Sequence, residues 1–182
     1  EFVDEVLADF GEGDYLLLQN EINMLDYIID QAYEKKMKIV MNPSPFDDKL
    51  NTCDLGKIYL FLLNEIEGEQ ITGYRDKDQI LDAMAEKFPN ARFVLTLGSD
   101  GAVYYDGKEK VFQDIFKVKA VDTTAAGDTF TGYFIAAVIE GRSVQEALRM
   151  AAKASSIAVS RPGATPSIPA IDEVKRELGM VE

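Results

Sequence analysis

VDTTAAGDTF, residues 121–130, places two carboxylates and a run of small residues directly before an apolar helical segment, Phe130 to Ile139. Small residues let backbone N–H groups approach a ligand closely, and a helix N-terminus carries about half a positive charge. The stretch therefore predicts an anion site, and phosphate is the anion that suits it best. Asp128 is an acid inside this anion site, which indicates a chemical role. Ordinary helix capping is the alternative.

The composition is that of a globular protein without a basic surface. Of the 182 residues 47% are hydrophobic and 28% are charged, which fits a single domain, residues 1–182, with a sizeable core. The net charge of −13 argues against non-specific binding to nucleic acid or to an anionic membrane. One cysteine and no histidine exclude an intrachain disulfide, zinc sites and Ser-His or Cys-His nucleophile pairs within the chain. No apolar run is long enough to span a membrane, and we expect a cytoplasmic protein.

Short apolar runs alternate with segments of helical spacing along the chain. The runs predict buried strands at 15–19, 38–41, 58–63 and 93–97, a hairpin of 102–105 with 110–112, and a further strand at 117–121. Helical patterns cover 1–10, 24–36, 65–71, 76–88, 127–140, 144–160 and 170–178. Because several strands are apolar throughout, we predict a doubly wound α/β fold with a mostly parallel sheet and helices on both faces.

Candidate ligand-binding residues follow the predicted strands, where ligands bind in such folds. They are Gln19, Asn42, Asn64, Gly98 and Asp122. Asn64 and Glu67 open a helix and form either an ordinary capping box or a site for hydrated Mg²⁺. The turn TLGSDG at 96–101 is either a plain strand connection or a close approach to nucleotide phosphates. The chain has neither a P-loop nor a Gly-x-Gly-x-x-Gly after its first strand.

Residues 121–132 resemble the second signature of the ribokinase-type (PfkB) carbohydrate kinases, Asp-Thr-x-Gly/Ala-Ala-Gly-Asp. Five further similarities follow the order of that family: LLQNE at 17–21, NPSP at 42–45, NEIE at 64–67, TLGSDG at 96–101 and RPGATPS at 161–167. The resemblance covers nearly the whole chain. Many family members have Gly where this chain has Ala125, and the Ala favours ribokinase over fructokinase.

The resemblance implies ATP-dependent phosphorylation of a sugar hydroxyl, with ribose converted to ribose 5-phosphate. Asp128 would be the base, and the anion hole would comprise Ala125, Ala126, Gly127 and Asp128. Asn64 and Glu67 would act on Mg²⁺ through water, and Glu21 would contact the sugar. The residues implied along the ATP site are Asn64, Thr96, Gly98 and Gly101. Those implied around a monovalent cation, usually K⁺, are Asp122, Thr124, Ala158, Arg161, Gly163 and Ser167.

The amino-terminal region of this family, with a Gly-Gly motif, most sugar contacts and a β-sheet lid, has no counterpart in the sequence. We therefore expect the carboxyl-terminal, ATP-side portion of such a kinase, whose full-length form is a homodimer through the lid. One alternative is a non-catalytic nucleotide-binding or interaction module. Another is a kinase of the same family that acts on fructose, 2-keto-3-deoxygluconate, a nucleoside or a sugar phosphate.

Overall fold

The computed structural model describes residues 1–180, which divide into two compact units. The first unit contains Glu1–Thr96 and Tyr105–Lys110, and the second contains Leu97–Tyr104 and the residues from Val111 onward. The single domain over residues 1–182 stays a prediction.

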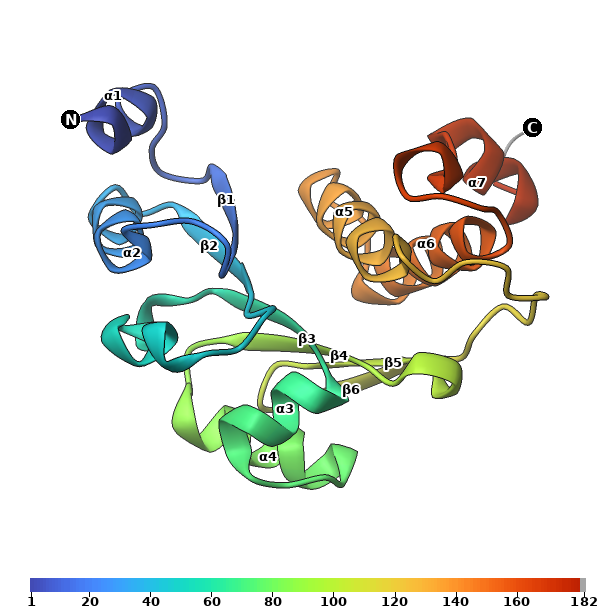
Figure 1. The fold of residues 1–182 in the computed structure, drawn as a ribbon, viewed down its shortest axis with the longest axis horizontal. Helices are drawn as coiled ribbons and strands as arrows, with labels where there is room; N and C mark the ends of the chain where they lie inside the picture. Colours follow the sequence, from blue (N-terminus) through green and yellow to red (C-terminus); the bar gives the residue numbers. More distant parts are fainter. Residues whose placement is uncertain (181–182) are drawn as a thin grey trace. The chain divides into compact units, whose positions relative to one another are not determined.

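The strands form one sheet, which runs in chain order from β1 to β6 (Figure 1). They are β1 (Tyr15–Gln19), β2 (Lys38–Asn42), β3 (Leu60–Asn64), β4 (Arg92–Thr96), β5 (Ala102–Tyr105) and β6 (Lys110–Gln113). The strands β1 to β4 pair in parallel. The connections 97–101 and 106–109 are too short for a parallel crossover, so β5 and β6 run antiparallel to their predecessors. The predicted α/β class with a mostly parallel sheet is confirmed.

Every predicted helix is present, with its ends shifted by a few residues. The helices are α1 (Phe2–Leu7), α2 (Leu25–Glu34), α3 (Glu65–Thr72), α4 (Lys77–Lys87), α5 (Ala126–Ile139), α6 (Val144–Val159) and α7 (Ile171–Glu177). The connection from β2 to β3 carries two short 3₁₀ turns, η1 (Asp48–Thr52) and η2 (Leu55–Lys57), in place of an α-helix. Pro43 and Pro45 lie at its start, and proline restricts both itself and the residue before it.

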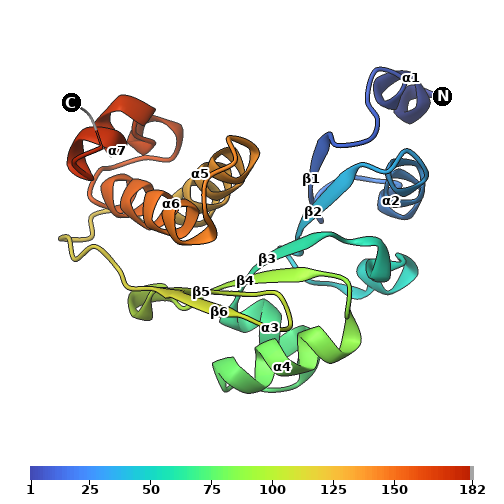
Figure 2. The ribbon, with the colours of Figure 1, turned by 180° about the vertical axis from the view of Figure 1, so that it is seen from behind.

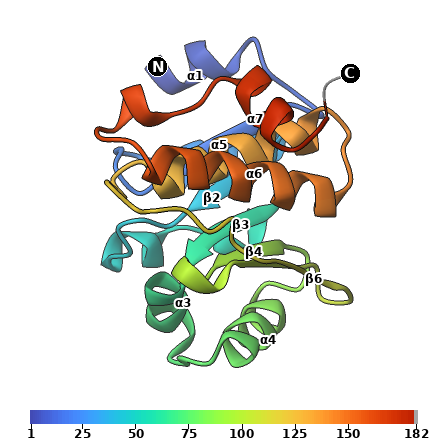
Figure 3. The same ribbon diagram turned by 90° about the vertical axis from the view of Figure 1, so that its right-hand side faces the viewer.

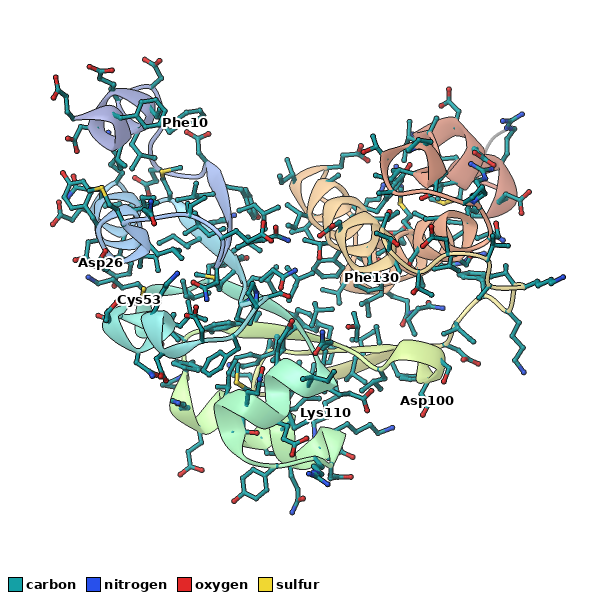
Figure 4. All side chains as sticks on the ribbon, viewed as in Figure 1. Phe10, Asp26, Cys53, Asp100, Lys110 and Phe130 are labelled. Carbon is teal, nitrogen blue, oxygen red and sulfur yellow. The ribbon has the colours of Figure 1, made fainter. Side chains whose placement is uncertain are left out.

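The core of the first unit lies between the parallel strands and helices α2 to α4 (Figures 1 and 2). Phe61 of β3 stacks on Phe93 of β4 with ring centroids 5.9 Å apart, and Met84 of α4 is fully buried. Burial of such side chains contributes about 1.5–3 kcal/mol each. Lys110 of β6, labelled in Figure 4, donates hydrogen bonds to the α4 carboxylates of Asp78 and Asp82.

The second unit is built around the packing of α5 on α6, which lie side by side (Figure 3). On α5, Phe130 and Phe134 are buried and stack with centroids 6.4 Å apart. The α6 residues Ala147, Ala151 and Ala154 are fully buried, and such small side chains let two helix backbones approach closely. Within residues 1–180 no helix combines the length and apolarity that a membrane span requires.

Two strand predictions need correction. Residues 117–121 form no strand: Lys117 and Val118 line a cavity, and the amide of Val121 donates to the carbonyl of Val159 at the end of α6. The apolar alternation there therefore serves a loop on α6 and not a sheet. The strand β1 is present, but it is not fully buried as predicted. Its residue Leu17 is 46% exposed, because β1 is the first strand of the described sheet.

Candidate functional site

In the first unit, the carboxyl ends of β1 to β4 carry a row of polar residues. Gln19 of β1 lies opposite Asn42 of β2, and Asn64 of β3 lies opposite Thr96 of β4. The Thr96 hydroxyl donates to the carbonyl of Leu63 at 3.4 Å. This row matches the sheet edge at which the sequence places ligand contacts.

Asn64 and Glu67 form a reciprocal capping box at the start of α3. The Glu67 carboxylate accepts from the backbone amide of Asn64 at 3.0 Å and from Asn64 Nδ2 at 3.2 Å. The backbone amide of Glu67 donates to Asn64 Oδ1 at 3.0 Å. Glu67 is only 6% exposed. No group of three or more potential His, Cys, Asp or Glu metal ligands occurs among residues 1–180. The pair therefore forms the capping box that the sequence offered as one reading, and its role toward Mg²⁺ stays a prediction.

Glu21 lies in the exposed turn that follows β1, one residue after the buried Asn20. Its side chain is open to a ligand from solvent. The structure therefore leaves the implied sugar contact of Glu21 available, at the same edge of the sheet as Asn64.

The two glycines of the 96–101 turn differ in whether the fold itself requires glycine at their positions. Gly101 has φ +96°, and a Cβ on it would lie 2.2 Å from the carbonyl oxygen of Gln113, so the fold itself requires glycine there. Gly98 has φ +53° and open space around its Cβ position. Open space of this kind admits a ligand, and Gly98 does line a cavity of the second unit.

The first turn of α5 carries the predicted anion hole. Ala125 caps the helix, and Ala126, Gly127 and Asp128 follow as its first three residues. The Ala126 amide donates to the carbonyl of Thr123 at 3.2 Å, so this predicted anion-hole amide already has an acceptor. Gly127 and Asp128 are exposed, and a Cβ on Gly127 would meet nothing within 4 Å. Neither packing nor backbone conformation requires glycine at 127, which is compatible with the predicted close approach of a ligand.

A cavity of about 810 Å³ lies beside this helix start within the second unit. It is lined by Gly98, Ser99, Ile115, Phe116, Lys117, Val118, Ala120, Thr123, Ala126, Ser155, Ser156 and Val159. The lining is largely apolar with a few hydroxyls and one cation, and the size lies in the range of small-molecule sites. Such a lining suits the adenosine part of a nucleotide. A separate cavity of about 420 Å³ is lined by Asp128 and further residues of α5.

Asp122 joins two loops of the second unit. Its Oδ1 accepts from the Thr124 amide at 3.0 Å and from the Thr124 hydroxyl at 2.6 Å, and its Oδ2 accepts from the Gly163 amide at 3.0 Å. These hydrogen bonds lower the pKa of Asp122 below its ordinary value, and the bond from the Thr124 hydroxyl has the largest effect. A carboxylate has about four lone-pair sites, so three hydrogen bonds leave room for a cation.

The other residues implied for a monovalent cation form hydrogen bonds among themselves or with further residues. The Ala158 carbonyl accepts from the Arg161 amide, the Arg161 side chain pairs with Glu173, and the Ser167 hydroxyl donates to the Ala164 carbonyl. Within residues 1–180, side-chain hydrogen bonds join Asp122 to Thr124 and Gly163 and to no other residue of the predicted set. Their cation role stays a prediction.

The sequence analysis did not identify three residues that support the candidate site. The Val159 carbonyl accepts from the amides of Val121 and Asp122, and the Ser155 hydroxyl donates to the Ala126 carbonyl at 3.1 Å. Asn20 anchors the turn that carries Glu21. Val159 acts through its backbone, which leaves no trace in the identity of the residue. The roles of the Ser155 hydroxyl and the Asn20 amide become visible only through their tertiary contacts.

Comparison with known proteins extends these findings. Residues 6–171 match the model of the pfkB family carbohydrate kinases. The chain is 35% identical to the ribokinase of Haemophilus influenzae, over 91% of this chain and 56% of that protein, and 36% identical to the ribokinase of Schizosaccharomyces pombe, over 95% and 57%. The solved structure of Arabidopsis thaliana ribokinase complexed with ribose and ATP superposes with a TM-score of 0.82 at 32% identity, over 90% of this chain and 55% of that one.

The chain thus spans a little over half the length of the relatives that it matches. The fold is ribokinase-like and partial relative to them. The family match covers most of the chain and includes the helix start at Asp128. The chain therefore belongs to the pfkB family of carbohydrate kinases.

Proposed function

We propose that this protein transfers the γ-phosphoryl group of ATP to a sugar hydroxyl, with ribose as the acceptor and ribose 5-phosphate as the product. The observation that carries the proposal is the start of α5, where an exposed glycine and Asp128 follow the loop that borders a cavity of nucleotide size. The relatives named ribokinase support ribose over the other acceptors. Fructose, 2-keto-3-deoxygluconate, a nucleoside or a sugar phosphate remains the alternative within the family.

Asp128 is the proposed base. Its carboxylate would accept the proton of the sugar hydroxyl while that oxygen bonds to the γ-phosphorus and the bond to ADP breaks. Phosphoryl transfer passes through a loose transition state, so a weak base is sufficient when the reactants are held in line. The amide of Gly127, at the positive end of α5, would stabilise charge on the transferring group. ATP supplies the phosphoryl group, and Mg²⁺ would neutralise its phosphates near Asn64 and Glu67.

Asp122 would act on the same loop from the other side. By holding Thr124 and Gly163, its carboxylate fixes the segment that leads into α5. A monovalent cation bound to its remaining lone pairs would fix this segment further, which supports activation by K⁺. Cytoplasmic location and a homodimeric full-length protein belong to the same proposal.

Calorimetric titration of this chain with MgATP tests the nucleotide part of the proposal. We expect binding that K⁺ strengthens and that Asp122→Ala weakens. Absence of MgATP binding to the folded chain, with and without K⁺, would refute it. The non-catalytic module is separated by ADP release with ribose, measured on the full-length product of the gene: a module would bind MgATP and release no ADP.

A further inference from the structure

Asn20 makes three hydrogen bonds from the end of β1 to the loop after β2. Its Nδ2 donates to the carbonyl of Pro45 at 2.7 Å and to Oδ1 of Asp47 at 2.9 Å, and its backbone amide donates to the carbonyl of Ser44 at 3.3 Å. The residue is only 5% exposed. These bonds cross from one strand end to the next at the sheet edge described above.

The chemistry of the contact requires an amide at this position. Two acceptors, the Pro45 carbonyl and the Asp47 carboxylate, converge on one nitrogen, and a side-chain NH₂ group supplies two donors. A serine hydroxyl supplies one donor, and an ionised aspartate supplies none and would repel Asp47. Leucine has a similar size but would leave both acceptors without this donor.

The loop on the far side of the contact is itself fixed. The Oδ1 atom of Asp47 also accepts from the Lys49 amide at 2.9 Å, which starts η1, and Leu50 of η1 is fully buried. The Asn20 amide is the largest cause of a lowered pKa for Asp47, which keeps the carboxylate ionised as an acceptor. Asn20 is therefore attached to a rigid support.

The contact also carries a cost that packing does not explain. The Oδ1 atom of Asn20 is buried and has no hydrogen-bond partner among the described residues. A buried acceptor without a donor destabilises the folded state, and such a group calls for an explanation in a native structure. The orientation of the amide is instead set by the two oxygens that its nitrogen reaches.

The position of Asn20 in the chain supplies that explanation. Residues 21–24 are all exposed, and the next buried residue is Leu25 in α2. Asn20 is thus the buried anchor directly before the exposed Glu21, one peptide bond away. Any shift of Asn20 displaces the Glu21 backbone with it.

We propose that Asn20 is a positioning residue for the acceptor sugar, which holds Glu21 at the sheet edge through its bonds to Pro45 and Asp47. This inference rests on the proposed function and on the sugar contact that the family resemblance implies for Glu21. Asn20 does not touch the reacting atoms, so its loss should affect sugar binding far more than nucleotide binding.

The test uses Asn20→Ser, which keeps one donor, and Asp47→Ala, which releases the same contact without changing Asn20. Asn51→Ala is the matched control, because Asn51 is exposed and bonds only to the neighbouring Asp48 carboxylate in the described contacts. On the full-length gene product we expect both test variants to raise the KM for D-ribose about tenfold or more while the KM for MgATP changes less than about twofold. The control should change neither constant.

A ribose KM that stays within about twofold of wild type in a folded Asn20→Ser variant overturns the proposal, as does an equal rise in both KM values. Amide hydrogen exchange on this chain separates this failure from that of the proposed function. Asn20→Ser should speed exchange at residues 21–24 and at 44, 46 and 47 but not in α4. Wild-type protein that phosphorylates no ribose refutes the proposed ribose kinase, whereas unchanged exchange at 21–24 refutes the anchor.

Discussion

The carboxylate of Asp122 accepts a hydrogen bond from the amide of Gly163, 41 residues further along the chain. The same carboxylate holds Thr124, two residues before the start of α5. The loop that leads into the proposed anion hole is therefore fixed to the loop after α6. Because a helix start binds an anion only when its amides are held in place, this contact links the fold of the second unit to its proposed chemistry.

Gly127 should be dispensable for folding and required for phosphate binding. A Cβ at this position meets nothing within 4 Å, and alanine in a helix is favoured over glycine by about 0.5–1 kcal/mol. We expect Gly127→Val to leave the urea unfolding midpoint near that of wild type. Its affinity for MgATP should fall about tenfold, the equivalent of one charge-assisted hydrogen bond.

Gly11→Val is the control for this variant, since a Cβ on Gly11 also meets nothing within 4 Å and Gly11 lies in the turn before β1. Calorimetry and urea unfolding on both variants decide the matter. Unchanged MgATP affinity in Gly127→Val would remove the anion hole from the account.

Gly101 should behave in the opposite way. Because its Cβ would lie 2.2 Å from the Gln113 carbonyl oxygen at φ +96°, Gly101→Ala should lower the free energy of unfolding by about 2–4 kcal/mol. Gly98→Ala has open space and should cost only the backbone strain of a positive φ, about 1–2 kcal/mol. Equal losses in the two variants, measured by urea unfolding, would show that the Gln113 contact is not the reason for glycine at 101.

Glu67→Gln separates the capping role of Glu67 from a role toward Mg²⁺. The amide oxygen can still accept from the Asn64 amide, so the loss of unfolding free energy should stay near 0.5–1.5 kcal/mol, about one hydrogen bond. Without the negative charge, the Mg²⁺ concentration for half-maximal ADP release should rise several-fold. An unchanged Mg²⁺ dependence would leave the pair as a capping box alone.

The pKa of Asp47 gives the protein a defined acid dependence. The Asn20 amide lowers this pKa, so the folded state binds a proton less readily than the unfolded state, whose aspartate pKa is about 3.9. The resulting stability is complete above that pH and is lost as the pH falls through the lower folded value. The unfolding free energy of wild type should therefore decline more steeply with acidification below about pH 5 than that of Asp47→Asn. Parallel curves for the two proteins would mean that the Asn20 contact does not form in solution.

Sequence patterns predicted the helices and strands better than they predicted the contacts between them. The strands β2, β3 and β4 are apolar in their central residues because both faces of a parallel strand are covered, and the turn at Gly107 has the positive φ that Asp-Gly tolerates. Residues 117–121 also have a strand-like local pattern, but the amide of Val121 bonds to the end of α6. No local pattern distinguishes a sheet partner from a helix end.

The site shows the same division. The anion hole and the base at 122–128 were inferred from residue types and a helix start, and only the helix start is confirmed. The Ala126 amide was expected to be available, but the Thr123 carbonyl accepts from it, because the turn before α5 closes on itself. The supports at Asn20, Ser155 and Val159 depend on residues distant in the chain, and a single sequence does not show which distant groups meet.

The central claim is that Asp128 is the base of a sugar kinase, and ribose-dependent release of ADP by the full-length gene product tests it most directly. Wild-type protein with MgATP and K⁺ should release ADP only when ribose is present. Asp128→Asn should lower kcat by about 10²–10⁴-fold, the usual contribution of a general base, while MgATP affinity stays within about twofold. An Asp128→Asn variant that keeps most of the wild-type kcat would contradict the account.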